Sequence, residues 1–179
     1  MDELQESWAS TVEGFAPWWS FWTLTFDLKG RGFEVSEDEA NNRFRRFIQI
    51  LNVDLFGKHY VQMVGHCYFP YAKVWERKAW GLGHLHALVS GPTNYTLANS
   101  VWRLMGGIIV IKPVTEQVGA ARYVSKYVTK GGEVELWRPR KMKEPSYKPL
   151  WYLDVMKNRL QTNTGNILYN LLDGYYHKR

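Results

Sequence analysis

Two tyrosines four residues apart, each followed three residues later by a lysine, are the first candidates for chemistry: Tyr123 with Lys126, and Tyr127 with Lys130. On a helix, positions i, i+3 and i+4 share a face, so the four side chains would form one surface of phenols and ammonium groups. A phenol is a poor nucleophile at neutral pH because its pKa is about 10. A metal ion and a lysine beside it would favour the phenolate, which can form a covalent ester with phosphate. An isolated pattern of this kind is otherwise typical of an ordinary surface helix, so the interpretation depends on a second motif.

That second motif is His84-Leu-His86, which follows a glycine-rich approach at Gly81 and Gly83. In a strand, residues two apart project from the same face, so the two imidazoles would point together toward one divalent ion. A third ligand is expected. His66, in a neighbouring predicted strand, is the first choice, and Glu76 is the rival because its carboxylate suits a hard ion.

The ion itself is expected to be Mn²⁺ or Mg²⁺. Imidazole ligands accept several divalent metals, and histidines favour Mn²⁺ over Mg²⁺ because Mg²⁺ prefers oxygen ligands. The single cysteine, Cys67, excludes an internal disulfide framework and a cysteine-based zinc site. A metal at this place would polarise a phosphate for attack by a tyrosine.

The elements that must position these groups follow from hydrophobic periodicity. Strands are predicted at 21–28, 59–69, 84–90 and 108–111, and helices at 36–57, 94–105 and from 115 or 116 to 130. Residues 71–83 are interpreted as a basic, aromatic connecting loop, part of which could extend the preceding strand. This order predicts an α+β fold: a central antiparallel sheet of four to five strands, with helices on one face and the active site on the open face.

Three regions are expected: an N-terminal arm at 1–16, formed by a mobile segment or a short helix packed on the sheet edge; a catalytic domain at 17–132; and a basic extension at 133–179. The net charge is +6 and aromatic residues make up 16% of the chain, which suits a polyanionic, base-bearing partner. No apolar run approaches the roughly 18 residues of a membrane span. The acidic N-terminus is unlike a signal peptide, so a cytoplasmic protein without a membrane partner is expected. The residues assigned to DNA contacts are Thr23, Thr25, Arg77, Lys78, Trp80 and Lys130.

Three segments in order, Thr23-Leu-Thr-Phe26, His84-Leu-His86 and Tyr123-Val-Ser-Lys-Tyr127, resemble motifs I, II and III of the HUH endonucleases. The tandem tyrosines look like those of the rolling-circle replication initiators (Rep) of plasmids and single-stranded DNA phages. The resemblance implies a sheet with the fold of an RNA-recognition module, one divalent ion, and cleavage of single-stranded DNA at a replication origin through a 5′-phosphotyrosine. It also implies that His84 and His86 are ligands and that Tyr123 and Tyr127 are nucleophiles assisted by Lys126, with Tyr123 favoured for the first cut.

The resemblance also implies partners. The sequence contains no Walker A motif, so a host helicase is expected to separate the strands and a host polymerase to extend the free end. Two alternatives remain open. One is a non-catalytic module that binds single-stranded nucleic acid, which would explain the charge and the aromatics. The other is an HUH relaxase or transposase, although relaxases carry their tyrosine near the N-terminus and small transposases usually have one tyrosine.

Overall fold

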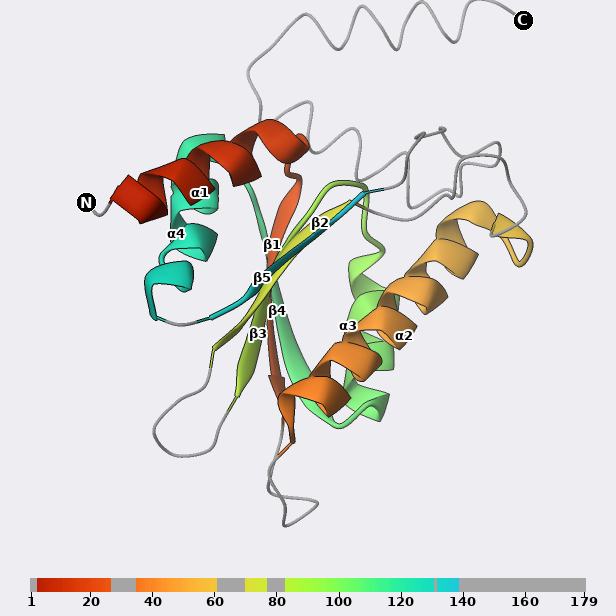
Figure 1. Cartoon of the computed structure of the whole chain (residues 1–179). Helices are drawn as coiled ribbons and strands as arrows, with labels where there is room; N and C mark the ends of the chain where they lie inside the picture. The colour runs from red at the N-terminus through yellow and green to blue at the C-terminus, as the bar shows by residue number, and fades with distance from the viewer. Residues whose placement is uncertain (1–2, 27–34, 61–69, 77–82, 131, 139–179) are drawn as a thin grey trace, which may run out of the picture.

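Five strands pair into one antiparallel sheet in the order β4-β1-β3-β2-β5 (Figure 1). The structure is a computed structural model, and it describes residues 3–26, 35–60, 70–76, 83–130 and 132–138. The strands are β1 (Ser20–Phe26), β2 (Tyr71–Glu76), β3 (His84–Val89), β4 (Gly107–Pro113) and β5 (Val134–Trp137).

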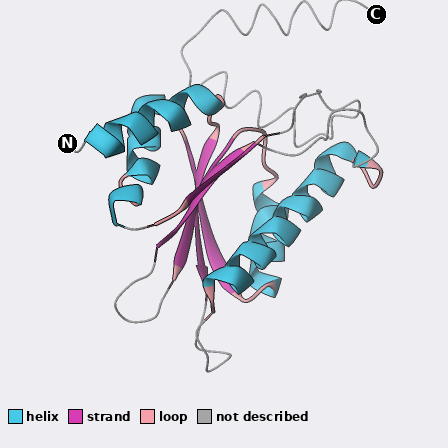
Figure 2. Cartoon of the chain, viewed as in Figure 1, coloured by secondary structure: helices cyan, strands magenta, loops and turns pink. Residues whose placement is uncertain are grey.

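Four helices cover parts of both faces of this sheet (Figure 2). They are α1 (Glu3–Phe15), α2 (Glu37–Phe56), α3 (Tyr95–Leu104) and α4 (Gln117–Ser125), and a short 3₁₀ helix, η2 (Val128–Lys130), follows α4. The expected α+β class with an open antiparallel sheet is confirmed. The helices α2 and α3 pack on one face, whereas α1 and α4 pack on the other, beside the histidine pair. None of the helices in the described part of the chain is long and apolar enough to span a membrane.

The alternation of β1 explains why one face of the sheet is a hydrophobic platform. Trp22, Leu24 and Phe26 are buried on the side of α2 and α3. There the Trp22 ring lies 5.6 Å from that of Phe47, which in turn lies 5.2 Å from that of Trp102. Burial of such aromatic side chains is a large favourable term in folding. The intervening β1 residues project to the opposite face, as the pattern predicts.

The helix boundaries agree closely with the sequence signals. Ser36 is the N-cap of α2, and its side chain accepts a hydrogen bond from the Glu39 amide. Gly57, with a φ of 86°, ends the same helix in a conformation that favours glycine. Asn94 caps α3 in the same way, by accepting from the Leu97 amide.

The interpretation of residues 71–83 as a loop is wrong for their first half, because Tyr71–Glu76 is a strand, β2, between β3 and β5. Its first four residues are all buried, since both faces of the strand are covered, and this removes the alternation on which the prediction depended. The predicted strand at 59–69 falls almost entirely outside the described residues, and residues 58–60 form a turn.

Three further features differ from expectation. The third helix ends at Ser125 and continues as η2, instead of running to residue 130. The sheet extends beyond residue 132, because β5 pairs with β2. The helix α1 packs on α4 instead of on the sheet edge, and the Gln5 amide donates to the Arg122 carbonyl at 3.5 Å.

Candidate active site

The histidine pair lies on the sheet face that carries α4, and threonines of the neighbouring strand hold both rings. In the pairing of β1 with β3, Thr25 lies opposite His84 and Thr23 lies opposite His86. The hydroxyl of Thr25 is hydrogen-bonded to His84 Nδ1 at 2.9 Å, and that of Thr23 to His86 Nδ1 at 3.2 Å. A hydrogen bond at Nδ1 fixes the orientation of each ring and leaves Nε2 as the atom that can bind a metal.

Glu76 projects beside the histidines because β2 pairs with β3 so that Glu76 lies opposite His84. Its Oε2 atom lies 2.9 Å from His86 Nε2. Of the two candidates for a third ligand, Glu76 is therefore the one found at the site, whereas His66 lies outside the described residues. The sequence pattern concealed this position, since the segment that carries Glu76 was interpreted as a loop.

The donor chemistry of this trio fits a divalent ion, although the three side chains are not closed around a point. Among the described residues, no three His, Cys, Asp or Glu side chains are grouped so that they could hold a metal as they stand. The separation of His86 Nε2 and Glu76 Oε2 is nevertheless about that of adjacent ligands at metal distances of roughly 2.1 Å. Two imidazole nitrogens and a carboxylate form a mixed set that Mn²⁺ accepts, and a rotation of His84 or Glu76 would be needed to complete it.

The position of α4 over the sheet is set at its start and along its buried face. Gln117 clamps the backbone of Trp18: its Oε1 accepts from the Trp18 amide and its Nε2 donates to the Trp18 carbonyl, both at 2.8 Å. Glu116 caps the helix by accepting from the Gly119 amide. Ala121 and Val124 are buried against the sheet. These contacts place the end of α4 over His86.

Tyr123 is the accessible phenol of the site. Its side chain is 40% exposed, and its ring lies edge-on to His86, with 5.7 Å between the centroids. The ring of Phe21 contacts both, stacked on His86 at 5.6 Å and edge-on to Tyr123 at 5.0 Å. Lys126 Nζ lies 3.4 Å from the centre of the Tyr123 ring, so a positive charge accompanies this tyrosine.

Tyr127 is buried, in contrast to the shared exposed face that the helical spacing predicts. The chain tightens after Ser125, and the Tyr127 ring stacks on His86 at 5.2 Å with an interplanar angle of 17°. Its hydroxyl donates to that of Tyr123 at 3.2 Å. Burial, the hydrogen bond to Tyr123 and the charge of Glu76 raise the pKa of Tyr127 well above its ordinary value. Lys130 Nζ lies 5.8 Å from the Tyr127 ring.

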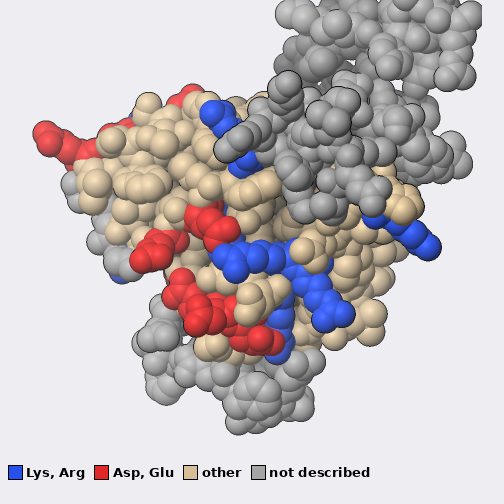
Figure 3. All heavy atoms as spheres, turned by 45° about the vertical axis from the view of Figure 1, so that its right-hand side comes forward, with Lys and Arg blue, Asp and Glu red and all other residues tan. Residues whose placement is uncertain are grey.

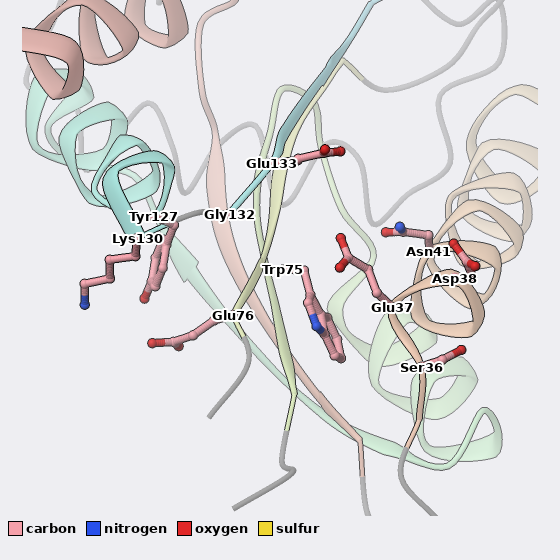
Figure 4. Close-up of a pocket in the computed structure, with 10 residues that line it drawn as sticks. All are labelled: Ser36, Glu37, Asp38, Asn41, Trp75, Glu76, Tyr127, Lys130, Gly132 and Glu133. Carbon is pink, nitrogen blue, oxygen red and sulfur yellow. The ribbon is translucent and has the colours of Figure 1, made fainter. Parts of the chain in front are cut away.

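A cleft lies on each side of this aromatic cluster. The larger, of about 770 Å³, lies on the Tyr127 side and reaches the start of α2. Figure 4 shows Glu76 directed toward Tyr127, with Glu37 and Asp38 on the far side of Trp75. In the view that brings the side of α2 forward, acidic side chains gather next to a strip of basic ones (Figure 3). The smaller cleft, of about 450 Å³, lies on the Tyr123 side, between β1, β4 and α4.

The structure thus brings together most of the predicted catalytic and metal-binding residues: Tyr123, Tyr127, Lys126, His84 and His86. Of the predicted DNA contacts, Thr23 and Thr25 bind the histidines, and Lys130 lies beside Tyr127. Arg77, Lys78 and Trp80 fall outside the described residues. The sequence interpretation missed Phe21 as a wall of the site, although its place two residues before Thr23 on an alternating strand gives it the same face.

A comparison with protein families finds one of replication-associated proteins, of the ORF2 type, whose model matches residues 19–132. This range begins just before β1 and ends after η2, so it includes every residue of the histidine and tyrosine cluster. No curated protein and no solved structure matches the chain.

Proposed function

Because the chain belongs to this ORF2-type family of replication-associated proteins, its role is in the initiation of DNA replication, and we propose that it nicks and rejoins single-stranded DNA at the origin through a phosphotyrosine ester. This is the activity of a rolling-circle initiator of the HUH type with tandem tyrosines. Its substrate would be single-stranded DNA at a replication origin, separated by a host helicase and extended by a host polymerase in the cytoplasm.

The observation that carries the proposal is the surroundings of the exposed phenol of Tyr123. Its ring contacts His86 at 5.7 Å, and the Lys126 ammonium lies 3.4 Å from the ring centre. A phosphate that contacts both groups would place its phosphorus next to a nucleophile and its oxygens next to a positive charge. Positioning and charge stabilisation of this kind are the main sources of catalysis in phosphoryl transfer.

The residues that would hold a divalent ion, Mn²⁺ or Mg²⁺, are His84, His86 and Glu76. When bound, the ion would act as a Lewis acid that polarises the scissile phosphate. Thr23 and Thr25 would serve this group indirectly, because their hydroxyls hold the imidazoles with Nε2 directed outward.

The proposed reaction is a transesterification. The phenolic oxygen of Tyr123 loses its proton to water and forms a bond with phosphorus, while the bond from phosphorus to the 3′ oxygen breaks. The 3′ oxygen takes up a proton and leaves as a free hydroxyl, and the 5′ phosphate remains on Tyr123. The energy of the phosphodiester bond is thereby conserved, so that a 3′ hydroxyl can later attack the ester and rejoin the strand.

Tyr127 would act after Tyr123. Its buried hydroxyl donates to that of Tyr123, so it is engaged while Tyr123 is free. Formation of the first ester would remove the partner hydroxyl and release Tyr127 to attack a second junction. Two nucleophiles within 3.2 Å of each other would allow one DNA end to be held while another is cut.

The test is the formation of a covalent adduct. The protein is incubated with Mn²⁺ and a library of single-stranded DNA of random sequence, and denaturing electrophoresis detects protein that carries DNA. We expect an adduct with the wild type that is lost with chelator and in the Tyr123→Phe/Tyr127→Phe double variant. Sequencing of the bound DNA would identify the nick site. Absence of an adduct across the library, or an adduct that survives chelator, would overturn the proposal in favour of a non-catalytic binding module.

A further inference from the structure

The cleft of about 450 Å³ beside Tyr123 has the composition of a site for a flat ligand. Its walls are apolar and come from different elements: Phe21 from β1, Val110 from β4 and Ala120 from α4. Its polar groups are few and include Lys112 and Thr115. Mostly apolar walls with a few polar groups are typical of pockets that bind small molecules, and the volume falls within their usual range.

The cleft adjoins the reacting groups directly. Tyr123 is one of its walls, and Phe21, another wall, stacks on His86 with 5.6 Å between the ring centroids. A group in the cleft would therefore be separated from His86 by the thickness of one ring. A nucleotide joined to a phosphate at the Tyr123 hydroxyl would have its base within reach of these walls.

The charges of the two clefts differ in the direction that this placement requires. On the Tyr123 side, Lys112 is exposed and forms no ion pair with a carboxylate of the described residues. Glu116 there is the N-cap of α4, and its Oε2 accepts from the Gly119 amide at 2.9 Å. The cleft on the Tyr127 side places four carboxylates around a single lysine: Glu37, Asp38, Glu76 and Glu133 around Lys130. A polyanion is therefore favoured on the Tyr123 side and repelled on the other.

We propose that the cleft beside Tyr123 binds the unpaired nucleobase that adjoins the scissile phosphate, an inference that rests on the nicking function proposed above. Phe21 and Val110 pack against the base, Thr115 contacts its polar edge, and Lys112 contacts a backbone phosphate. Contacts between bases and aromatic or apolar walls tolerate different sequences, whereas a polar edge contact discriminates between bases. The cleft is thus a place where sequence preference at the nick can arise.

The test separates base contacts from phosphate contacts. Two fluorescent probes are compared in EDTA, where no nicking is expected: a 12-nucleotide DNA pool of random sequence, and a 12-nucleotide strand that is abasic throughout and carries the same phosphates. Ala120→Leu fills the cleft without changing the charge, and Thr115→Leu fills it from the exposed rim. Leu104→Ala, an exposed position of α3 on the opposite face of the sheet, is the matched control. Circular dichroism verifies the fold of each variant.

We expect the wild type to bind the base-bearing pool more tightly than the abasic strand. Each folded cleft variant should lose about tenfold in affinity for the pool, with little change for the abasic strand, and Leu104→Ala should match the wild type. Retention of base-dependent binding in a folded cleft variant would overturn the inference, as would an equal loss on both probes or a wild type that ignores the bases.

The outcome is distinguishable from that of the nicking proposal. If no covalent adduct forms with Mn²⁺ but the cleft variants lose base-dependent binding, the nicking function fails and the cleft remains a base-binding site. If the adduct forms and the cleft variants bind both probes like the wild type, the nicking function stands and the assignment of the cleft fails.

Discussion

The two tyrosines are equivalent in sequence spacing but not in surroundings. Tyr123 is 40% exposed and accompanied by Lys126, whereas Tyr127 is 3% exposed and donates its hydroxyl hydrogen to Tyr123. The order of cutting that we favour follows from this difference, because a buried phenol that serves as a donor is less available for attack. The i, i+4 spacing indicated a pair, but only the tightening of the chain after Ser125 makes the pair asymmetric.

We therefore predict that Tyr123→Phe abolishes formation of the first covalent adduct, whereas Tyr127→Phe retains it and loses the transfer of a DNA end to a second strand. The measurement is single-turnover adduct formation, followed by a chase with a second labelled oligonucleotide. An adduct that survives in Tyr123→Phe but not in Tyr127→Phe would reverse the assignment. Tyr95→Phe, at an exposed position of α3, controls for loss of a phenol elsewhere.

The threonines of β1 lead to a second prediction at the scale of single residues. Their hydroxyls bind Nδ1 of each histidine, so Thr23→Val and Thr25→Val should each lower the affinity for Mn²⁺ by roughly 10- to 100-fold. Binding of single-stranded DNA in EDTA should change little. Titration with Mn²⁺ and fluorescence anisotropy measure the two quantities separately. A loss confined to DNA affinity would instead support the direct DNA contact that the sequence suggested for these residues.

At the scale of elements, the sheet and its cover depend on close approaches that only glycine permits. A Cβ atom at Gly107, the first residue of β4, would collide with the Thr25 carbonyl oxygen and with the Trp102 indole nitrogen. These two groups are themselves hydrogen-bonded at 3.3 Å. The start of β4 therefore supports the same stretch of β1 that holds His84.

Gly107→Ala is accordingly predicted to destabilise the fold by about 1–3 kcal/mol, the usual cost of overpacking, and to weaken Mn²⁺ binding. The matched control is Gly14→Ala in α1, where a Cβ meets nothing within 4 Å. That change should be neutral or stabilise by up to about 1 kcal/mol, because alanine is the better helix former. Urea denaturation measures both. Equal midpoints for the two variants would contradict the packing argument.

Which elements could be predicted from the sequence depends on how each one is buried. Where one face is exposed, as in β1 and α2, the periodicity is clean and the elements were predicted with their caps. Where both faces are covered, as in β2, the periodicity disappears, and with it the means to place Glu76 opposite His84. The bonds from threonine to histidine depend on the register of β1 and β3, which no local pattern specifies.

At the scale of the whole molecule, one buried cation joins three elements on the face away from the tyrosines. Lys73 of β2 is 4% exposed, and its ammonium donates to Asn41 of α2 and pairs with Glu135 of β5, both at 2.7 Å. The Tyr71 hydroxyl donates to the same carboxylate at 2.7 Å. The edge strand that completes the sheet is thus connected to the central strands and to α2 through Glu135.

This network predicts how stability depends on pH. Burial alone would raise the pKa of Glu135, but the hydrogen bonds from Lys73 and Tyr71 and the charges of Lys73 and Arg45 outweigh it and hold the pKa below its ordinary value of 4.5. A carboxyl group with a lowered pKa stabilises the fold above its unfolded pKa, and this contribution is lost as the pH falls through the folded pKa. Glu135→Gln should therefore be less stable than the wild type at pH 7, and the difference should shrink below pH 4.5. Urea midpoints at pH 7, 5 and 3 measure this, with Glu13→Gln on the exposed side of α1 as the control. A difference that stays constant from pH 7 to pH 3 would mean that the carboxylate contributes through its shape and not through its charge.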